Sequence, residues 1–154
     1  MRNTNTPTSF KALQIITYAL CIGVVMFLGV AFMLKHTELV LWPGEGQDRL
    51  LNIIALVMAV ASVLLSNILF QSLLSKIDTG LPVSEKLPQY VTAYVVRFAL
   101  MEGMGLFNVV VFLLTGCLIN AAMAIAIILL MLAVKPTREK TIDDLKVYYP
   151  DTLD

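Results

Sequence analysis

The chain has 154 residues, close to the length of one domain, and 58% of them are hydrophobic while 14% are charged. A soluble domain is about half apolar and about a quarter charged, so this composition indicates a membrane protein instead. The formal net charge is zero, so the net charge indicates no partner. From the apolar composition we expect the lipid bilayer as a partner, and we expect no nucleic acid partner.

Four long apolar runs predict four transmembrane helices, at 12–34, 50–74, 91–114 and 117–134. At about 1.5 Å of rise per residue, each run crosses or nearly crosses a hydrocarbon core about 30 Å thick. The runs are apolar all round, as lipid-facing helices must be. The first run is longer than the roughly 7–15 apolar residues of a signal peptide and lacks a small-x-small cleavage site, so we interpret it as a retained span.

Lysine and arginine predict the orientation. With four spans, the N-terminus, the second loop and the C-terminus share one side, and the opposite side has only Lys35 and Arg49. The first side has Arg2, Lys11, Lys76, Lys86, Lys135, Arg138, Lys140 and Lys146. The expected fold is an all-α integral membrane protein, an up-down-up-down bundle of four transmembrane helices with both termini in the cytoplasm.

This fold divides the chain into three parts. We expect a polar N-terminal segment at 1–11, the transmembrane domain at 12–134, and a cytoplasmic tail at 135–154. The second loop, with Gly80, Pro82 and Pro88, is expected at roughly 75–90, and Thr115-Gly116 predicts a tight turn between the last two spans. In the tail, a short helix is expected from Thr137 to about Val147, with Ile142, Leu145 and Tyr149 along one stripe. This stripe either packs against the rest of the protein at the inner loops, lies on the membrane surface or binds a partner.

Glu102 is the first candidate functional residue, because it lies about halfway along the third predicted span. An ionised carboxylate at that depth costs several kcal/mol unless it is paired, hydrogen-bonded or protonated. Two interpretations stay open. Glu102 is either a protonatable functional site or a structural carboxyl that is hydrogen-bonded between helices.

Arg97 is the second charge in this span, about 9–10 Å inside its cytoplasmic end by helix rise. Its long stem either reaches the interface or finds an interhelical partner. Matching depths from the cytoplasmic ends predicts a polar cluster of Arg97, Glu102, Asn67 and Gln71. Ser66 lies near the depth of Glu102, and Asn108 lies on nearly the same face as Arg97 but further out.

Small residues form further stripes. Ala55, Ala59, Ser62 and Ser66 have heptad spacing in the second span. Small residues four positions apart let helices approach closely, within one subunit or between subunits. Such pairs occur at Ala19 and Gly23, Ala99 and Gly103, and Ala122 and Ala126.

The sequence contains no pattern typical of a catalytic, metal or cofactor site. There is no glycine-rich phosphate loop, no Cys/His metal spacing, and no Ser-x-x-Lys, His-Glu-x-x-His or Gly-x-Ser-x-Gly motif. His36 is the single histidine, so most acid–base and nucleophile arrangements lack a member. We therefore expect no enzyme activity, no catalytic residue, no metal and no cofactor.

Three segments resemble a known family. They are Phe10-Lys11-Ala12-Leu13-Gln14-Ile15-Ile16, the stretch from Arg97 to Asn108 with Phe112-Leu113-Leu114-Thr115-Gly116, and Lys135-Pro136-Thr137-Arg138-Glu139-Lys140 with Ile142-Asp143-Asp144-Leu145. Together they resemble an uncharacterised family of small four-span membrane proteins from Bacteroidota-type bacteria. The resemblance implies a location in the bacterial inner (cytoplasmic) membrane and brings no known activity.

A second, local resemblance involves Glu102-Gly103-Met104-Gly105-Leu106-Phe107, which is similar to the carboxylate helix of rotary ATPase proteolipid (c-type) subunits. There a glutamate is followed by small and aliphatic residues and then an aromatic residue. The partner helix in that family has a glycine repeat, whereas the predicted span at 50–74 contains no glycine.

The leading functional hypothesis is a small non-enzymatic inner-membrane protein that acts through helix–helix contacts, as a homo-oligomer or with another membrane protein. The alternative is a proton- or ion-handling membrane subunit that uses the carboxyl group of Glu102. A third hypothesis, an enzyme that acts on lipid, needs a nucleophile or a metal set that the sequence lacks.

Overall fold

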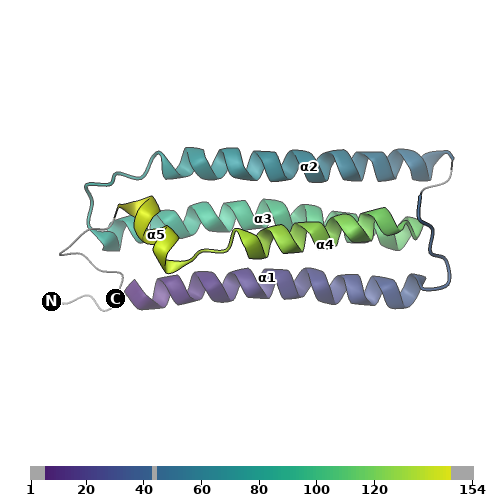
Figure 1. Ribbon diagram of the computed structural model, residues 1–154, viewed down its shortest axis with the longest axis horizontal. Coiled ribbons are helices and arrows are strands. Elements are labelled where there is room, and N and C mark those ends of the chain that lie inside the picture. The colour runs from purple at the N-terminus through teal and green to yellow at the C-terminus, as the bar shows by residue number, and fades with distance from the viewer. Residues whose placement is uncertain (1–5, 43–44, 147–154) are drawn as a thin grey trace.

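The computed structural model describes residues 6–42 and 45–146, and this part of the chain is all-helical (Figure 1). Three long helices and a fourth of about half their length lie side by side, and a short fifth helix lies at an angle to them at the end of the bundle where the first helix begins. The helices are α1 (Thr6–Lys35), α2 (Gln47–Leu74), α3 (Val83–Thr115), α4 (Leu118–Ala133) and α5 (Arg138–Leu145).

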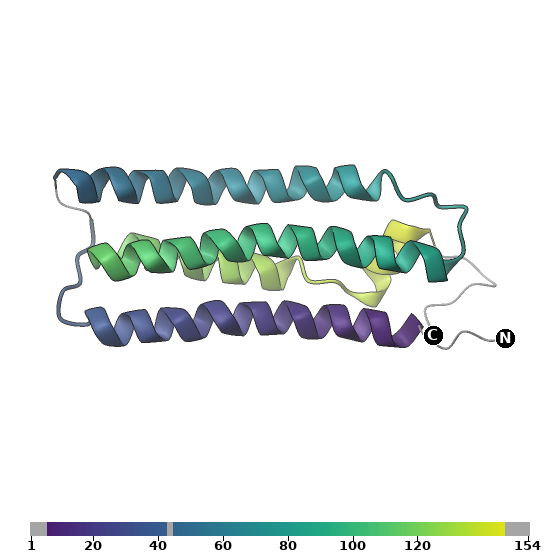
Figure 2. The same cartoon turned by 180° about the vertical axis from the view of Figure 1, so that it is seen from behind.

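Helix α3 is the centre of the bundle, because it contacts each of the other four helices. Figures 1 and 2 show α1 and α2 on opposite sides of α3, with α4 against one face of α3. The fully buried side chains of Tyr94, Phe98, Met101 and Phe112 lie along α3 and form much of the hydrophobic core. Side chains on different faces of α3 therefore contact different neighbouring helices.

Three of the helices are long and apolar enough to cross a membrane, within Lys11–Lys35, Asp48–Leu74 and Val83–Thr115. Helix α4 has 16 residues, so its length is about 24 Å at 1.5 Å per residue, less than a hydrocarbon core of about 30 Å. After α4 the chain bends by 69° into α5. The structure thus supports a helical membrane protein with three long apolar helices and one shorter one.

Helix α3 begins earlier than the sequence predicted. The expected loop at 75–90 ends at the N-cap residue Pro82, and the helix then includes Pro88. The physical reason is an amphipathic pattern, since Val83, Leu87 and Tyr90 are buried while the residues between them are mostly exposed. Proline is tolerated because it removes one hydrogen bond near the helix start, where carbonyl groups still reach solvent.

The turn between α3 and α4 depends on Gly116. Its φ is +67°, a left-handed conformation that favours glycine, and its N–H donates to the carbonyl of Phe112 at 2.7 Å. A Cβ atom on Gly116 would collide with the carbonyl oxygen of Glu38. The first loop is held against this turn by Val40, whose N–H donates to the Gly116 carbonyl at 3.0 Å and whose carbonyl accepts from Leu118 at 2.8 Å.

The first loop has its own local structure next to α1. Lys35 Nζ donates to Glu38 Oε2 at 2.6 Å. This hydrogen bond, together with the positive charge of Lys35, holds the pKa of the exposed Glu38 carboxyl below its ordinary value. Trp42, which lies further along the loop, is exposed, as expected for a side chain at the edge of a bilayer.

The small-residue stripe of α2 faces the bundle. Ala55, Ala59 and Ser66 are fully buried, and Ser62 is 9% exposed. These short side chains let α2 lie close to α3, its main neighbour. The bulkier residues of α2, among them Val57, Leu64 and Ile68, are exposed on the opposite face.

Candidate functional site

Arg97 lies in the contact between α2 and α3. Its Nη2 donates to Oδ1 of Asn67 on α2, and its side chain is only 7% exposed. The guanidinium carbon lies 4.7 Å from the centre of the Phe70 ring, a cation–π contact. Arg97 therefore has an interhelical partner, one of the two arrangements that the sequence left open.

Aromatic rings surround this arginine. The ring centres of Phe70 and Tyr94 are 4.6 Å apart with an edge-on angle of 73°, and those of Tyr94 and Phe98 are 5.7 Å apart. The Nε atom of Arg97 is buried and has no hydrogen-bond partner among residues 6–42 and 45–146. The guanidinium group thus lies between the Asn67 amide and the Phe70 ring, which itself packs on Tyr94.

Of the predicted cluster of Arg97, Glu102, Asn67 and Gln71, the structure joins Arg97 to Asn67 by a hydrogen bond. Gln71 forms no hydrogen bond with Arg97 among the described residues, and Glu102 faces α1 rather than α2. The separation of Glu102 from Arg97 is angular, since positions five apart on a helix differ by about 140°. Arg97 and Glu102 therefore contact different neighbouring helices, and depth alone was not enough to group them.

Glu102 lies where α1 and α3 meet. Its Oε1 atom is 3.9 Å from the position that a Cβ atom would take on Gly23 of α1. The side chain is partly exposed. Within the described part of the chain, no residue forms a hydrogen bond or an ion pair with this carboxyl group.

The depth of Glu102 follows from its neighbour. Gly23 is the middle residue of the apolar run 12–34, so the carboxyl group lies level with the middle of α1. In a bilayer this is the centre of the hydrocarbon core, where a charged side chain costs about 3 kcal/mol or more. Glu102 therefore needs a proton, or a partner that lies outside the described contacts.

Ser66 and Asn108, the remaining candidates, bond to their own helices. Ser66 Oγ donates to the Val63 carbonyl at 2.8 Å, and Asn108 Nδ2 donates to the Met104 carbonyl at 2.9 Å. Both side chains are fully buried. Neither one contacts Arg97 or Glu102 by a hydrogen bond, so the six candidate residues do not form one site.

A second polar group, which the sequence analysis missed, holds α5 against the start of α3. The hydroxyl of Tyr90 donates to Oδ2 of Asp144 at 3.0 Å. Lys86, only 3% exposed, donates to the carbonyls of Thr79 at 2.9 Å and Leu145 at 3.3 Å. The sequence analysis predicted the short helix of the tail but placed Lys86 in the loop at roughly 75–90, so it did not pair the two.

In this region Leu145 is buried against the core, and Thr137 caps α5 by accepting a hydrogen bond from the backbone of Lys140. Packing of α5 against the bundle was one of the arrangements that its stripe allowed. Tyr149, the third member of the predicted stripe, and Val147 lie outside the described residues.

A third polar group connects α2 and α4 at the other end of the bundle. Asn120 Nδ2 donates to Oδ1 of Asn52, and Asn52 Nδ2 donates to the Asp48 carbonyl at 2.6 Å. Both asparagine side chains are buried. The depth matching that paired Arg97 with Asn67 would also have paired these two residues, because both lie close to the outer ends of predicted spans.

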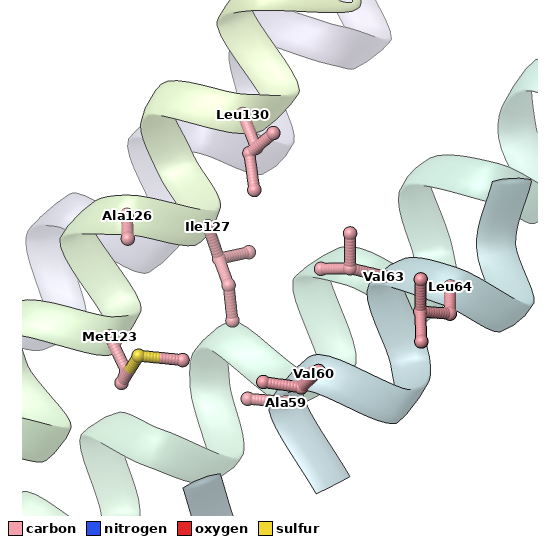
Figure 3. Close-up of a pocket in the computed structure, with 8 residues that line it drawn as sticks. All are labelled: Ala59, Val60, Val63, Leu64, Met123, Ala126, Ile127 and Leu130. Atoms are coloured by element: carbon pink, nitrogen blue, oxygen red, sulfur yellow. The ribbon is translucent and has the colours of Figure 1, made fainter. Parts of the chain in front are cut away.

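An apolar groove of about 180 Å³ lies between α2 and α4 (Figure 3). Its walls are the side chains of Ala59, Val60, Val63, Leu64, Met123, Ala126, Ile127 and Leu130. No polar or titratable side chain lines it, so it has no group for catalysis or for binding an ion.

Among residues 6–42 and 45–146, no three His, Cys, Asp or Glu side chains are grouped so that they could hold a metal ion. Cys21 and Cys117 are both free thiols. Comparisons with protein-family models, with curated proteins and with solved structures gave no match. The candidate site is therefore defined by geometry alone, and its centre is Glu102.

Proposed function

We propose that this chain is a four-span, non-enzymatic protein of the bacterial inner membrane that acts by associating with other transmembrane helices. The observation that carries the proposal is the position of Glu102. Its carboxyl group is level with the middle of α1, partly exposed, and unpaired among the described residues. In a stable membrane protein the free-energy cost of such a carboxyl group in the hydrocarbon core is offset by other interactions. A neighbouring transmembrane helix that contacts the carboxyl group is able to provide them.

Four spans are supported by the position of α4. This helix is short, but it packs along α3 and α1, which are both long enough to cross a membrane. A helix enclosed in this way lies at the same depth as its neighbours. Cys117 and Val134 extend its apolar length, and Lys135 beyond them is able to reach the interface.

Cytoplasmic termini are supported by the distribution of charge. The end of the bundle that contains the start of α1 and all of α5 also contains most of the lysine and arginine residues. The described ones are Lys11, Lys76, Lys86, Lys135, Arg138, Lys140 and Lys146. The opposite end has Lys35 and Arg49, so the positive-inside rule assigns the first end to the cytoplasm.

Photo-crosslinking in intact membranes tests association. A photoreactive amino acid in place of Gly103 lies next to Glu102, at a position where a Cβ atom meets no other atom within 4 Å. Val57, an exposed residue of α2, is the matched control. We expect a protein crosslink from position 103, to a second copy or to another protein, at several times the yield from position 57. Equal yields from the two positions would contradict the proposal.

Proton or ion handling is the second candidate, and the same exposed carboxyl group favours it. A carboxyl group that is open to its surroundings at mid-depth is able to exchange a proton or bind a cation. If this function is correct, proteoliposomes that contain the protein will show a flux that Glu102→Gln removes. If the protein gives no flux above empty liposomes, this candidate fails while the association proposal stands.

A further inference from the structure

We infer that the surface around Glu102 binds a transmembrane helix of a different protein, and that this helix has a lysine or arginine near the middle of the bilayer. The inference rests on the proposed function, because it names the partner of the same site. We define the Glu102 seam as Ala19 and Gly23 of α1 with Ala99, Glu102 and Gly103 of α3.

The seam has room for a helix. Ala19, Gly23, Ala99 and Gly103 are all exposed. A Cβ atom on Gly103 would meet nothing within 4 Å, and one on Gly23 would meet only the Glu102 carboxyl group at 3.9 Å. Both helices therefore present small residues beside the carboxyl group, which lets a third backbone approach closely and leaves space for a long side chain.

The charge at the seam selects the chemistry of the partner. Within the described residues no group donates a hydrogen bond to this carboxyl group, and across the contact its Oε1 atom lies 3.9 Å from the position that a Cβ atom would take on Gly23. A lysine or arginine side chain supplies both an opposite charge and hydrogen-bond donors, and its long stem is able to lie along the small residues. An apolar helix would bury the carboxyl group without compensating it.

A second copy of this chain lacks the required cation. Arg97 is the only basic residue within the four predicted spans. Its guanidinium group is occupied by Asn67 and Phe70, and the residue is 7% exposed. Lys35 and Lys135 lie at the ends of helices, about half a bilayer away from Glu102. Charge complementarity therefore indicates a different protein.

The test uses the full chain in phosphatidylethanolamine/phosphatidylglycerol vesicles, labelled with a fluorescent donor. The probe is a synthetic polyleucine transmembrane helix with one central lysine and an acceptor label, and the control helix has methionine at that position. Energy transfer measures binding. We expect the lysine helix to bind at least about tenfold more tightly than the methionine helix, and Glu102→Gln to abolish this difference.

A second variant keeps the test valid if Glu102→Gln perturbs folding. Gly103→Leu leaves the carboxyl group in place but fills the seam, and we expect it to weaken lysine-helix binding at least fivefold, whereas Val57→Leu on α2 leaves binding unchanged. Equal binding of the two helices to the wild-type protein would overturn the inference.

The failure of this inference is distinguishable from that of the proposed function. One possible result is Glu102-dependent energy transfer between two copies of the chain and no energy transfer to the lysine helix. In that case the partner is a second copy. That result overturns the inference and leaves the proposed function standing. If neither pair shows energy transfer and position 103 gives no crosslink in membranes, both proposals fail.

Discussion

The hydroxyl group of Tyr90 donates a 3.0 Å hydrogen bond to the carboxylate of Asp144, and this contact joins α5 to the beginning of α3. Lys86 strengthens the same junction by donating to the carbonyl of Leu145 at 3.3 Å. The C-terminal helix is therefore held by polar contacts in addition to the burial of Leu145.

Removing the Tyr90 hydroxyl should loosen α5. In Tyr90→Phe the ring packing against Tyr94 stays, but Asp144 loses a donor, which costs about 1–2 kcal/mol. We expect faster hydrogen–deuterium exchange of the α5 amides, measured by mass spectrometry, and the same effect in Asp144→Ala, which removes the acceptor. Asp143→Ala is the control, because Asp143 is exposed. Faster exchange in the control variant as well would show that the Tyr90 contact does not hold the helix.

Asn67 should stabilise the bundle more than its neighbour Gln71 does. Asn67→Leu leaves the guanidinium group of Arg97 without its amide acceptor, so we expect a loss of about 1–2 kcal/mol in the free energy of unfolding. Gln71→Leu, at an exposed position one turn away, should change it by less than about 0.5 kcal/mol. Denaturant titration in bicelles measures both, and equal losses would mean that the Arg97–Asn67 contact contributes nothing.

The asparagine pair at the outer end should show energetic coupling. Asn52→Leu or Asn120→Leu alone leaves the other amide buried without its partner, while the double variant removes both. A double-mutant cycle in bicelles should give a coupling energy of about 0.6–2 kcal/mol. If the two single losses simply add in the double variant, the two amides do not stabilise each other.

Gly116 should be the most sensitive glycine for stability. Gly116→Ala forces a side chain into a left-handed conformation and against the carbonyl of Glu38, so we expect a loss of about 1–3 kcal/mol and a lower Tm in detergent. Gly29→Ala is the matched control, since a Cβ atom there meets nothing within 4 Å and helices favour alanine. A Tm in Gly116→Ala as high as that of the control would contradict the role of the turn.

The apolar runs of the sequence were sufficient to predict an all-helical chain with long apolar helices, and Thr115-Gly116 was sufficient to predict the turn between the last two. Both features are local. Membrane-length helices follow from hydropathy because the backbone must satisfy its own hydrogen bonds in lipid, and a left-handed glycine is a local conformational preference. The early start of α3 was missed, because Pro82 and Pro88 suggested a loop while the burial that extends the helix comes from distant residues.

The grouping of polar residues was decided by the tertiary structure. Depth along a helix is a one-dimensional quantity. It grouped Arg97 with Asn67, to which the structure joins it, and also with Glu102 and Gln71, to which the structure shows no hydrogen bond from Arg97 among the described residues. Which side of α3 faces α1 and which faces α2 depends on how all four helices pack. The sequence by itself determined the residues that are costly to bury in lipid. Only the packing decided that Arg97 has an internal partner and that Glu102, facing Gly23, has none among the described residues.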